Sequence, residues 1–418
     1  MQRRFSILLI SFHSSTDNQA TTDVNLKYKL ITNPSQLADL CCRVATAATV
    51  AFDTEFVSEF SYYPQLCLIQ VALDEELFIV DTCEVPNVDS FWQALTEGDH
   101  ETIVHAGREE FRFALRSVGQ GPRNWFDIQL AAGMVGIEYP ASYGKLTARL
   151  LNKKVPKGET RTDWRRRPLT PDQLEYALSD VTHLKPMRDK LQERLARLNH
   201  GEWHDDESRI WQQSLIEFDS KPRWRRVSGI SGLNPTSLAI VREISKWRDE
   251  EAKTRDIPSK RVLRDDLIVE LARRRSPDEK KIRAIRGLDR RDLKDQYGKL
   301  SQAISDAIDS PEPNVSRRRQ SELSTHLNQI VSLLGAALDA LCREQSIAPS
   351  IVGTAQDLRD LVAYKLEPSD DAPPPRLAEG WRAGVVGQKI ERLLNGQLAI
   401  RIRDPFSDIP LEFKETQS

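Results

Sequence analysis

The chain of 418 residues has only five cysteines, and no two of them are separated by just two residues. Their odd number and this spacing argue against a disulfide framework and a cysteine-based zinc site, and they predict a protein of the reducing cytoplasm. The sequence also lacks a glycine-rich phosphate loop and a dinucleotide-binding fingerprint, so we expect no nucleotide cofactor.

An excess of charge of one sign is missing too. Lysine and arginine number 60 against 62 aspartates and glutamates, which leaves a formal net charge of -2. No global positive field therefore draws the chain to nucleic acid, and any site for a polyanion must be a local patch. Hydrophobic residues make up 39% and charged residues 29%, a balance that excludes an integral membrane protein and a wholly disordered chain.

The N-terminus only weakly imitates a secretion signal. Arg3 and Arg4 precede an apolar run of eight residues, 5–12, and no small-residue cleavage site follows at once. We interpret residues 1–27 as a disordered extension, or as the product of a start codon assigned too far upstream. A secreted protein is the less favoured alternative.

From residue 28 to about residue 200, short apolar runs alternate with amphipathic stretches. The runs 49–56, 66–73, 77–80 and 102–105 are rich in β-branched and aromatic residues, which favours strands. Early strands with helices interleaved later indicate one α/β domain on a mixed sheet. The expected helices cover 90–96, 109–118, 126–136, 142–151 and 171–198.

Strand signals vanish after Gly201, and the remaining chain predicts helices only. The stretch 310–316, which contains proline and serine, separates two helical blocks. We expect a linker or helix over 201–232, a helical domain over 233–310, a second one over 320–405 and a tail over 406–418.

Asp53 and Glu55 lie in an otherwise apolar predicted strand. Residues two apart on a strand project to the same face, so both carboxylates point the same way. Such a pair costs desolvation free energy unless a cation lies beside it, and hard cations such as Mg²⁺ or Mn²⁺ prefer oxygen ligands. Alone, however, this spacing is common on surface strands and indicates no function.

Two further acidic elements strengthen the case. Tyr176 and Asp180 are four residues apart in a predicted helix and therefore share one face. Glu110 lies in the first turn of another predicted helix, just after the strand that ends at His105. Either element alone is typical of an ordinary helix. Three acidic elements at one sheet edge, one of them with a tyrosine, favour a two-metal site for in-line phosphodiester hydrolysis.

These motifs resemble the three Exo motifs of the DEDD superfamily of 3′–5′ exonucleases, in the subgroup with a motif III tyrosine. More narrowly, the chain resembles the ribonuclease D family. The resemblance implies an RNase H-like (DnaQ-like) exonuclease domain with a mixed central sheet over 28–200, followed by two all-α HRDC-like domains. The matching stretches are 52–57, 62–70, 105–107, 161–164, 167–169, 173–177 and 179–181, with helical matches at 257–298 and from 377 onward.

The resemblance also implies roles for the site residues. Asp53 would bridge two divalent cations, Mg²⁺ or Mn²⁺, while Glu55 and Asp180 would ligate the one that activates the attacking water. Tyr176 would orient that water, because an ordinary tyrosine pKa of about 10 makes it a poor base at neutral pH. The second ion, near the leaving 3′ oxygen, would rely on Glu110.

Glu110 departs from the family, which has aspartate at this position. Glutamate carries the same charge but reaches one methylene further, whereas Mg²⁺ demands near-ideal octahedral geometry. The second ion site is then shifted, weakened or tuned toward Mn²⁺, and we expect activity to be retained. Glu109 is the alternative ligand, although it faces about 100° away on the helix.

Substrate contacts are expected from the loop before the Tyr176 helix, which also holds Arg165 and Arg166. Arginine and tryptophan together can clamp phosphates and stack on bases. The other basic clusters, 221–226 and 280–291, have the periodicity of exposed faces, and His183 is expected to be structural. The expected contacts are Arg161, Trp164 and Arg167, with Gln70 and His105 as further candidates.

The sequence thus predicts a monomeric, metal-dependent 3′–5′ exoribonuclease that releases 5′-monophosphates. That its substrate is precursor tRNA, trimmed at the 3′ end, follows from the resemblance alone. Two alternatives stay open: an exonuclease for single-stranded DNA, and an RNA-binding protein whose catalysis Glu110 has weakened. The retention of the other four site groups argues against the second.

Overall fold

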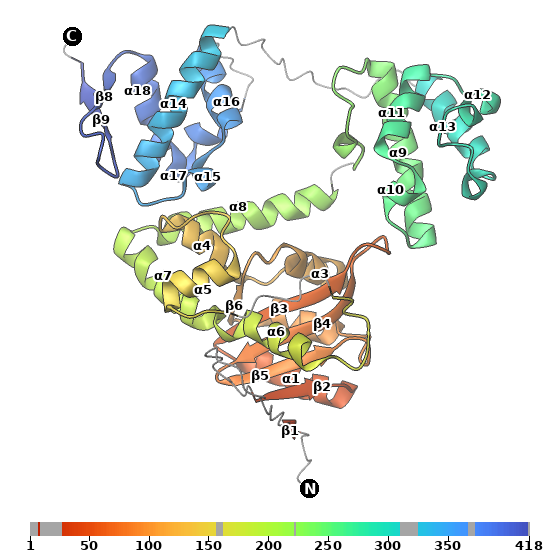
Figure 1. The fold of residues 1–418 in the computed structure, drawn as a ribbon, viewed down its shortest axis with the longest axis horizontal. Helices are drawn as coiled ribbons and strands as arrows, with labels where there is room; N and C mark the ends of the chain where they lie inside the picture. The colour runs from red at the N-terminus through yellow and green to blue at the C-terminus, as the bar shows by residue number, and fades with distance from the viewer. Residues whose placement is uncertain are drawn as a thin grey trace, which may run out of the picture.

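The computed structural model describes residues 7–8, 27–155, 162–220, 223–309, 325–366 and 373–416. Figure 1 shows a sheet-containing domain, a helical domain around α9 and a second helical domain around α14. This architecture confirms the α/β domain and the helical C-terminal part expected from the sequence. Most of the N-terminal stretch 1–27, expected to be a disordered extension, lies outside the described residues.

A seven-stranded mixed sheet forms the centre of the first domain, in the order β1-β2-β5-β4-β3-β6-β7. β3, β4 and β5 are antiparallel neighbours, whereas β6 runs parallel to β3 and β7 runs parallel to β6. The strands are β1 (Ile7–Leu8), β2 (Tyr28–Ile31), β3 (Thr49–Val57), β4 (Gln65–Leu73), β5 (Glu76–Asp81), β6 (Glu101–Val104) and β7 (Asn124–Asp127).

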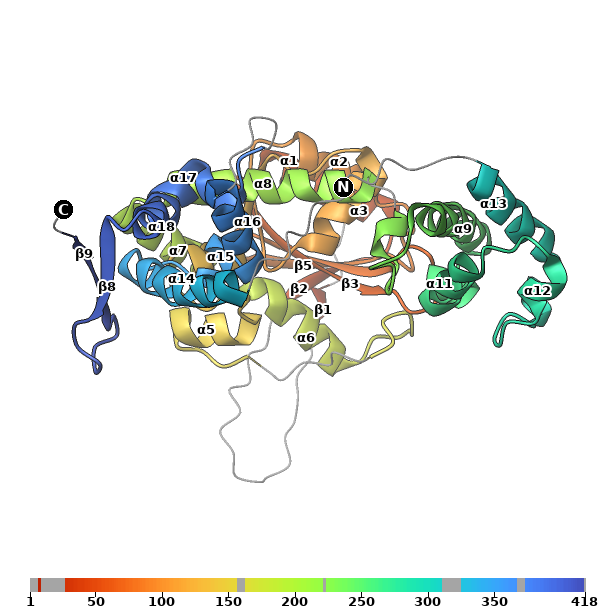
Figure 2. The same ribbon diagram turned by 90° about the horizontal axis from the view of Figure 1, so that it is seen from above.

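Helices cover both faces of this sheet (Figure 2). α1, α2 and α3 pack on one face, in a core that contains Phe52 and Trp92. α6 covers the other face, where Leu178 packs with Leu68. Because side chains alternate along a strand, β3 directs Phe52 to the first face and Asp53 to the second. The helices are α1 (Pro34–Thr46), α2 (Asp89–Glu97), α3 (Arg108–Val118), α4 (Ile128–Met134), α5 (Tyr143–Leu151), α6 (Pro171–Thr182), α7 (Leu184–Leu198) and α8 (Gly201–Ser220).

The strand β2 and the helix α1 were not predicted from the sequence, and two predicted segments differ from the structure. Phe126, predicted to begin a helix, instead lies in β7, and the helix α4 starts only after Asp127 caps it. The helix predicted over 171–198 is broken at His183, which ends α6 and precedes α7. In both places the chain must change direction to pack on the sheet, a requirement that local periodicity does not reveal.

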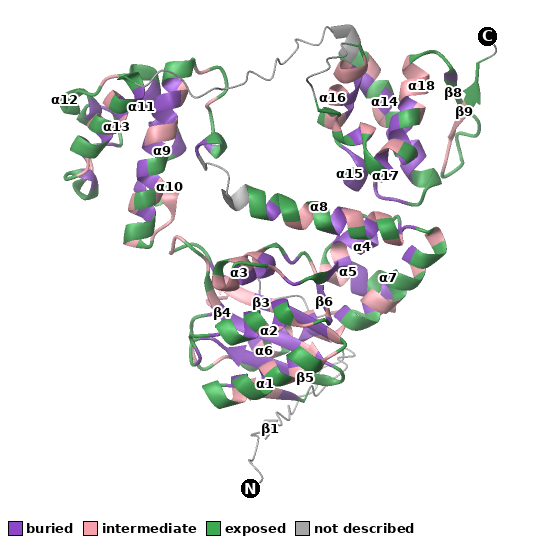
Figure 3. Cartoon of the chain, turned by 180° about the vertical axis from the view of Figure 1, so that it is seen from behind, coloured by how far each residue is buried: buried purple, intermediate pink, exposed green. Residues whose placement is uncertain are grey.

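The first helical domain packs around α9. Its core contains Ile240 and Ile244 from α9, Leu271 from α11 and Ile304 from α13. Figure 3 shows exposed residues on the outer sides of these helices and buried ones between them. The elements are η1 (Arg223–Arg226), α9 (Pro235–Arg255), α10 (Ser259–Val262), α11 (Asp265–Arg274), α12 (Glu279–Arg283), η2 (Arg291–Leu293) and α13 (Tyr297–Asp309).

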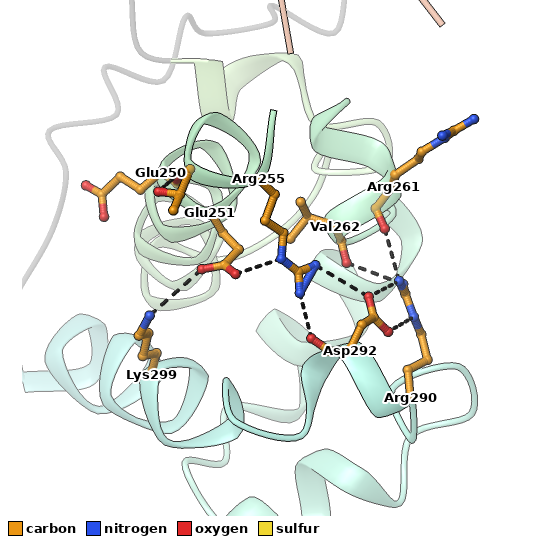
Figure 4. Close-up of polar contacts among 9 residues, drawn as sticks. Glu250, Glu251, Arg255, Arg261, Val262, Arg290, Asp292 and Lys299 are labelled. Atoms are coloured by element: carbon orange, nitrogen blue, oxygen red, sulfur yellow. Dashed lines mark hydrogen bonds and ion pairs between the residues drawn. The ribbon is translucent and has the colours of Figure 1, made fainter. Parts of the chain in front are cut away.

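A network of arginines fixes the end of α10 in this domain (Figure 4). Arg290 donates to the carbonyl oxygens of Arg261 (3.1 Å) and Val262 (3.3 Å). Asp292 pairs with Arg290 (2.6 Å) and with Arg255 of α9 (3.5 Å). The backbone of Arg261 is therefore held in place, while its side chain extends away from the network.

The loop between β3 and β4 contacts the same end of this domain. The backbone N–H of Tyr62 donates to Asp256 (3.1 Å), and Lys253 lies 5.7 Å from the Tyr62 ring. The guanidinium of Arg261 lies 5.3 Å from the centroid of the Phe60 ring. Two aromatic side chains that follow β3 thus join the sheet-containing domain to the first helical domain.

The second helical domain ends in a β-hairpin, which the sequence reasoning missed. β8 (Leu398–Ile402) pairs with β9 (Leu411–Glu415), so strands do occur after Gly201, and part of the predicted tail over 406–418 is ordered. No helix in the parts of the chain described here is both long and apolar enough to cross a membrane. The helices are α14 (Thr325–Glu344), α15 (Pro349–Val352), α16 (Ala355–Leu366), η3 (Arg376–Ala378), α17 (Gly380–Arg382), η4 (Ala383–Gly387) and α18 (Gln388–Leu394).

A buried ion pair and a close backbone approach fasten this domain to the sheet-containing domain. Glu207 of α8 pairs with Arg382 at 2.7 Å, and the arginine side chain is only 3% exposed. Trp203 stacks on Trp381, with 5.6 Å between the ring centroids. A Cβ on Gly133 of α4 would lie 2.3 Å from Ile351, so only glycine permits this contact.

We predict that Glu207→Ala destabilises the docking of the second helical domain by about 3–5 kcal/mol, because it leaves the buried Arg382 unpaired. Chemical denaturation and limited proteolysis of the full chain measure the effect. Glu344→Ala removes an exposed ion pair with Lys389 (3.1 Å) and should cost less than about 1 kcal/mol. Equal stabilities of the two variants would contradict the docking role of Glu207.

Candidate active site

Four carboxylates converge around β3, an interior strand of the sheet. Asp53 and Glu55 lie on the β3 face that α6 covers, and Asp180 lies on α6 itself. Glu110 comes from α3. Burial raises the pKa of Asp53 well above its ordinary value, and the negative charges of the other three carboxylates raise it further. The structure therefore brings the four predicted acidic residues within electrostatic reach of one another.

The same crowding affects the other three groups. Burial raises the pKa of Glu55 to about 8, and the charges of Asp180 and Glu110 add to the effect. Burial also raises the pKa of Glu110 to about 7 and the pKa of Asp180 to about 7. Desolvation and like charges both disfavour the ionised form. No described basic side chain is among the main influences on these pKa values.

Tyr176 lies one helical turn before Asp180 and donates a hydrogen bond to its carboxylate. This is the side-by-side arrangement expected from their spacing. Burial, and then the charge of Asp180, raises the pKa of the phenol, so the hydroxyl stays protonated at neutral pH. The ring of Trp164 packs against Tyr176, with 6.1 Å between the centroids. Tyr176 can thus orient a bound molecule but is a poor base.

Glu110 is almost completely buried, with 6% of its surface exposed. The hydroxyl of Thr54, which lies between the two β3 carboxylates, donates a short hydrogen bond to it. The neighbouring Glu109 instead pairs with Arg112 at 2.6 Å. Of the two glutamates, only Glu110 is thus part of the carboxylate cluster.

A tight turn before α3 positions Glu110. The carboxylate of Asp127 accepts hydrogen bonds from the backbone N–H groups of Ala106 (3.0 Å) and Gly107 (3.1 Å). Ala106 has a φ of 56°, and a Cβ on Gly107 would lie 2.6 Å from the Trp125 ring. Sequence reasoning missed Asp127. Its one local signal was its place as the N-cap of α4, in a stretch predicted to be helical.

Tyr143 of α5 supports the end of α6 and was also missed. Its hydroxyl donates to the carbonyl oxygen of Ser179 (2.6 Å) and accepts from the backbone N–H of His183 (3.2 Å). Burial raises the pKa of this phenol. Both contacts flank Asp180, so Tyr143 holds the helix end that carries this carboxylate.

The predicted substrate contacts of the loop before α6 lie in different environments. Arg167 pairs with Asp81 at 2.5 Å and donates to the carbonyl oxygen of Trp164 (2.8 Å). Trp164 is only 4% exposed, whereas the side chain of Arg166 is 85% exposed. Arg161 lies outside the described residues. The internal contacts of Arg167 and Trp164 are those of residues that support the site.

The two other candidates for substrate contact are also engaged or covered. His105 Nε2 lies 2.9 Å from the carbonyl oxygen of Ala141, and its ring contacts Tyr143 edge-on. Gln70 is completely buried on β4. Contact of either residue with substrate stays a prediction.

The donor set fits a divalent cation. Carboxylate oxygens are the ligands that Mg²⁺ and Mn²⁺ prefer, and buried negative charge needs a balancing cation. In the described part of the chain, no three His, Cys, Asp or Glu side chains are already closed around one point. The charges of Glu110 and Asp180 nevertheless raise the pKa of Asp53 and of Glu55. The residues that could hold the ion are Asp53, Glu55, Glu110 and Asp180.

Comparison with known proteins gives consistent matches over most of the chain. Residues 28–196 match the 3′–5′ exonuclease family, and residues 237–304 match the HRDC domain family. Ribonuclease D of Nitrobacter hamburgensis is 30% identical over 376 residues, which cover 89% of this chain and 97% of that protein. Ribonuclease D of Gluconacetobacter diazotrophicus is 31% identical over 378 residues, or 89% of this chain and 94% of the other.

Solved structures with the same fold include Escherichia coli RNase D, described as an exoribonuclease involved in structured RNA processing. It matches with a TM-score of 0.73 and 24% identity over 88% of this chain and 99% of that one. The catalytic core of RRP6 from Trypanosoma brucei matches with a TM-score of 0.54 and 22% identity over 71% and 83% of the two chains.

We predict that the metal-free protein loses stability as the pH rises from about 4, the ordinary carboxyl pKa, to about 8. The folded-state pKa values of Glu55, Glu110 and Asp180 are raised, so the stability these groups contribute is lost as the pH passes through about 7 to 8. Asp53→Asn removes one crowded charge and should raise the unfolding temperature in EDTA by about 2–5 °C at the higher pH. Scanning calorimetry measures both effects.

The matched control is Asp189→Asn. Asp189 is an exposed acid that pairs with Lys185 at 2.8 Å, so its loss should not stabilise the protein. An Asp53→Asn variant no more stable than the wild type in EDTA would show that the carboxylates do not repel one another.

Proposed function

The chain belongs to the ribonuclease D family of 3′–5′ exoribonucleases, and we propose that it removes nucleotides from RNA 3′ ends by two-metal hydrolysis that releases 5′-monophosphates. The main observation behind this proposal is the partly buried cluster of four carboxylates, with Tyr176 hydrogen-bonded to Asp180. We further propose precursor tRNA as the substrate, and action as a cytoplasmic monomer. The five cysteines, all free thiols, are consistent with the cytoplasm.

The carboxylates and Tyr176 have different roles in the proposed reaction. Asp53, Glu55, Glu110 and Asp180 would hold the divalent cations, which when bound stabilise the charge on the attacking and leaving oxygens. Tyr176 keeps its proton and orients the attacking water through its hydroxyl. Asp180 accepts the hydrogen bond of Tyr176 and so fixes the direction in which that hydroxyl points.

This chain has Glu110 where the family has aspartate. The hydrogen bond between Thr54 and Glu110 supports the proposal that the protein is active with the longer side chain. A longer side chain has one more rotatable bond, and an anchor on one of its oxygens limits that freedom. The other oxygen remains able to act as a ligand. Glu110 therefore fits a working second ion site better than a site that has lost its function.

Two arginines lie over the Phe60 ring, where the loop between β3 and β4 meets the first helical domain. Arg165 lies 4.8 Å from the Phe60 ring centroid, and Arg261 of the first helical domain lies 5.3 Å from it. Arg261 has no carboxylate partner among the described residues. The carboxylate cluster repels phosphates. We therefore propose that the RNA strand crosses the joint, the contact between the β3–β4 loop and the first helical domain, where Arg261 contacts a phosphate.

We predict a metal-dependent ladder of products from a 5′-labelled single-stranded RNA, with Mg²⁺ or Mn²⁺ and not with EDTA. Asp53→Ala should lower the rate by at least about 1000-fold, because it removes a shared ligand of both ions. Glu109→Ala is the matched control, since Glu109 pairs with Arg112, and should keep the rate within about threefold. A matched DNA oligomer tests the preference for RNA.

The variant Glu110→Asp restores the family residue. It decides whether Glu110 tunes the second ion site of an active enzyme or has weakened the catalysis of an RNA-binding protein. If the wild type is active, this variant should shift the relative rates with Mg²⁺ and Mn²⁺. A wild type that binds RNA but is inactive with both metals, together with an active Glu110→Asp variant, would overturn the proposed hydrolysis and indicate an RNA-binding protein.

We also predict that Arg261→Ala raises KM for a long RNA about fivefold and lowers the slope of log KM against log salt by about 1, because one phosphate contact is lost. KM for a trinucleotide should not change. The matched control is Arg264→Ala, since Arg264 pairs with Asp266 at 2.9 Å and should leave both values unchanged. Equal effects on long and short RNA would contradict the path across the joint.

A further inference from the structure

Gln70 is a buried polar side chain without a hydrogen-bond partner. None of its surface is exposed, and neither its amide oxygen nor its amide nitrogen has a partner among the described residues. A buried amide that leaves its donors and acceptor unpaired costs stability, because its lost hydration is not replaced. Such a group in a native structure calls for a functional explanation.

The strand register places Gln70 beside the most crowded carboxylate. β3 and β4 are antiparallel, and Gln70 pairs directly with Asp53. Side chains directly opposite on neighbouring antiparallel strands lie on the same face, with Cβ atoms about 4.5–5.5 Å apart. On the other side Gln70 pairs with Ile79 of β5. Asp53 is therefore the polar neighbour of Gln70 in this row across the sheet.

The surroundings leave the amide few other partners. Ile79 belongs to an apolar cluster with Leu68 and with Leu178 of α6, which covers this face. The carboxylate of Asp53 receives a hydrogen bond from the backbone of Thr54, and no side-chain hydrogen bond to it occurs among the described residues. An amide donor and an under-coordinated carboxylate thus lie side by side in an apolar setting.

We propose that Gln70 is a positioning residue, whose amide N–H, unpaired in the metal-free site, donates to the carboxylate of Asp53 once the cations are bound and sets its orientation toward them. This inference rests on the proposed function of the site. Asp53 keeps its remaining lone pairs for the ions, while the amide holds the carboxylate from the protein side. Complete burial of Gln70 favours this positioning role over direct contact with substrate.

The test replaces Gln70 with methionine, which is similar in size but has no N–H donor. In EDTA, Gln70→Met should unfold at the same temperature as the wild type or at a higher one, since an unpaired buried amide is removed. Calorimetric titration of the metal-free protein with Mg²⁺ should show affinity lower by about tenfold, and kcat should fall about 10- to 100-fold with KM within about threefold.

Leu68→Met is the matched control, because Leu68 is equally buried on the same strand face and pairs with Glu55. It should leave Mg²⁺ affinity and kcat close to those of the wild type. The proposal is overturned if Gln70→Met loses stability in EDTA, which indicates packing alone, or if it retains the wild-type Mg²⁺ affinity and kcat.

The proposed RNA hydrolysis and the proposed role of Gln70 are tested by different measurements. An inactive wild type would refute the proposed hydrolysis. The comparison of Gln70→Met with wild type in EDTA and in the Mg²⁺ titration requires no RNA and still decides the role of Gln70.

Discussion

The mutual repulsion of four carboxylates, of which Glu110 is buried and the other three are partly buried, is the constraint on which the rest of the structure depends. Left alone, such groups would separate or move to solvent, because burial and like charge both disfavour their ionised forms. Here they are carried on a strand in the middle of the sheet and on two helices packed against opposite faces. The rigidity of these elements opposes the repulsion and keeps the negative charge available for divalent cations.

Several residues outside the cluster supply that rigidity. Asp127 holds the turn before α3 through two backbone N–H groups, and Tyr143 ties the end of α6 to α5. Trp164 packs on the ring of Tyr176, and Arg167 anchors the preceding loop to Asp81. These contacts explain why tryptophan and arginine occur beside a phosphodiester-cleaving site without being open to solvent: they fix the elements that carry the chemistry.

The sequence predicted the elements whose periodicity is local and missed those that depend on distant contacts. Spacing of two on a strand and four on a helix placed Asp53 with Glu55 and Tyr176 with Asp180. Its place as the N-cap of α4 is the one local signal of Asp127, and it does not reveal the role of this residue, since the backbone groups that Asp127 holds lie about 20 residues away in the chain. The short strand β7 and the hairpin β8–β9 were not predicted either, because pairing partners decide whether such short segments are strands.

The same limit applies to charge. A net charge of -2 indicates no attraction for a polyanion, and the carboxylate cluster makes the site itself repulsive. Binding of RNA therefore requires cations at the rim whose charge is not neutralised internally. Among the arginines near the joint, Arg165 pairs with Asp163 and Arg264 with Asp266, whereas Arg261 lies on Phe60 with its backbone fixed by Arg290. Composition cannot reveal this difference, because it arises from which arginines find a carboxylate partner in the folded chain.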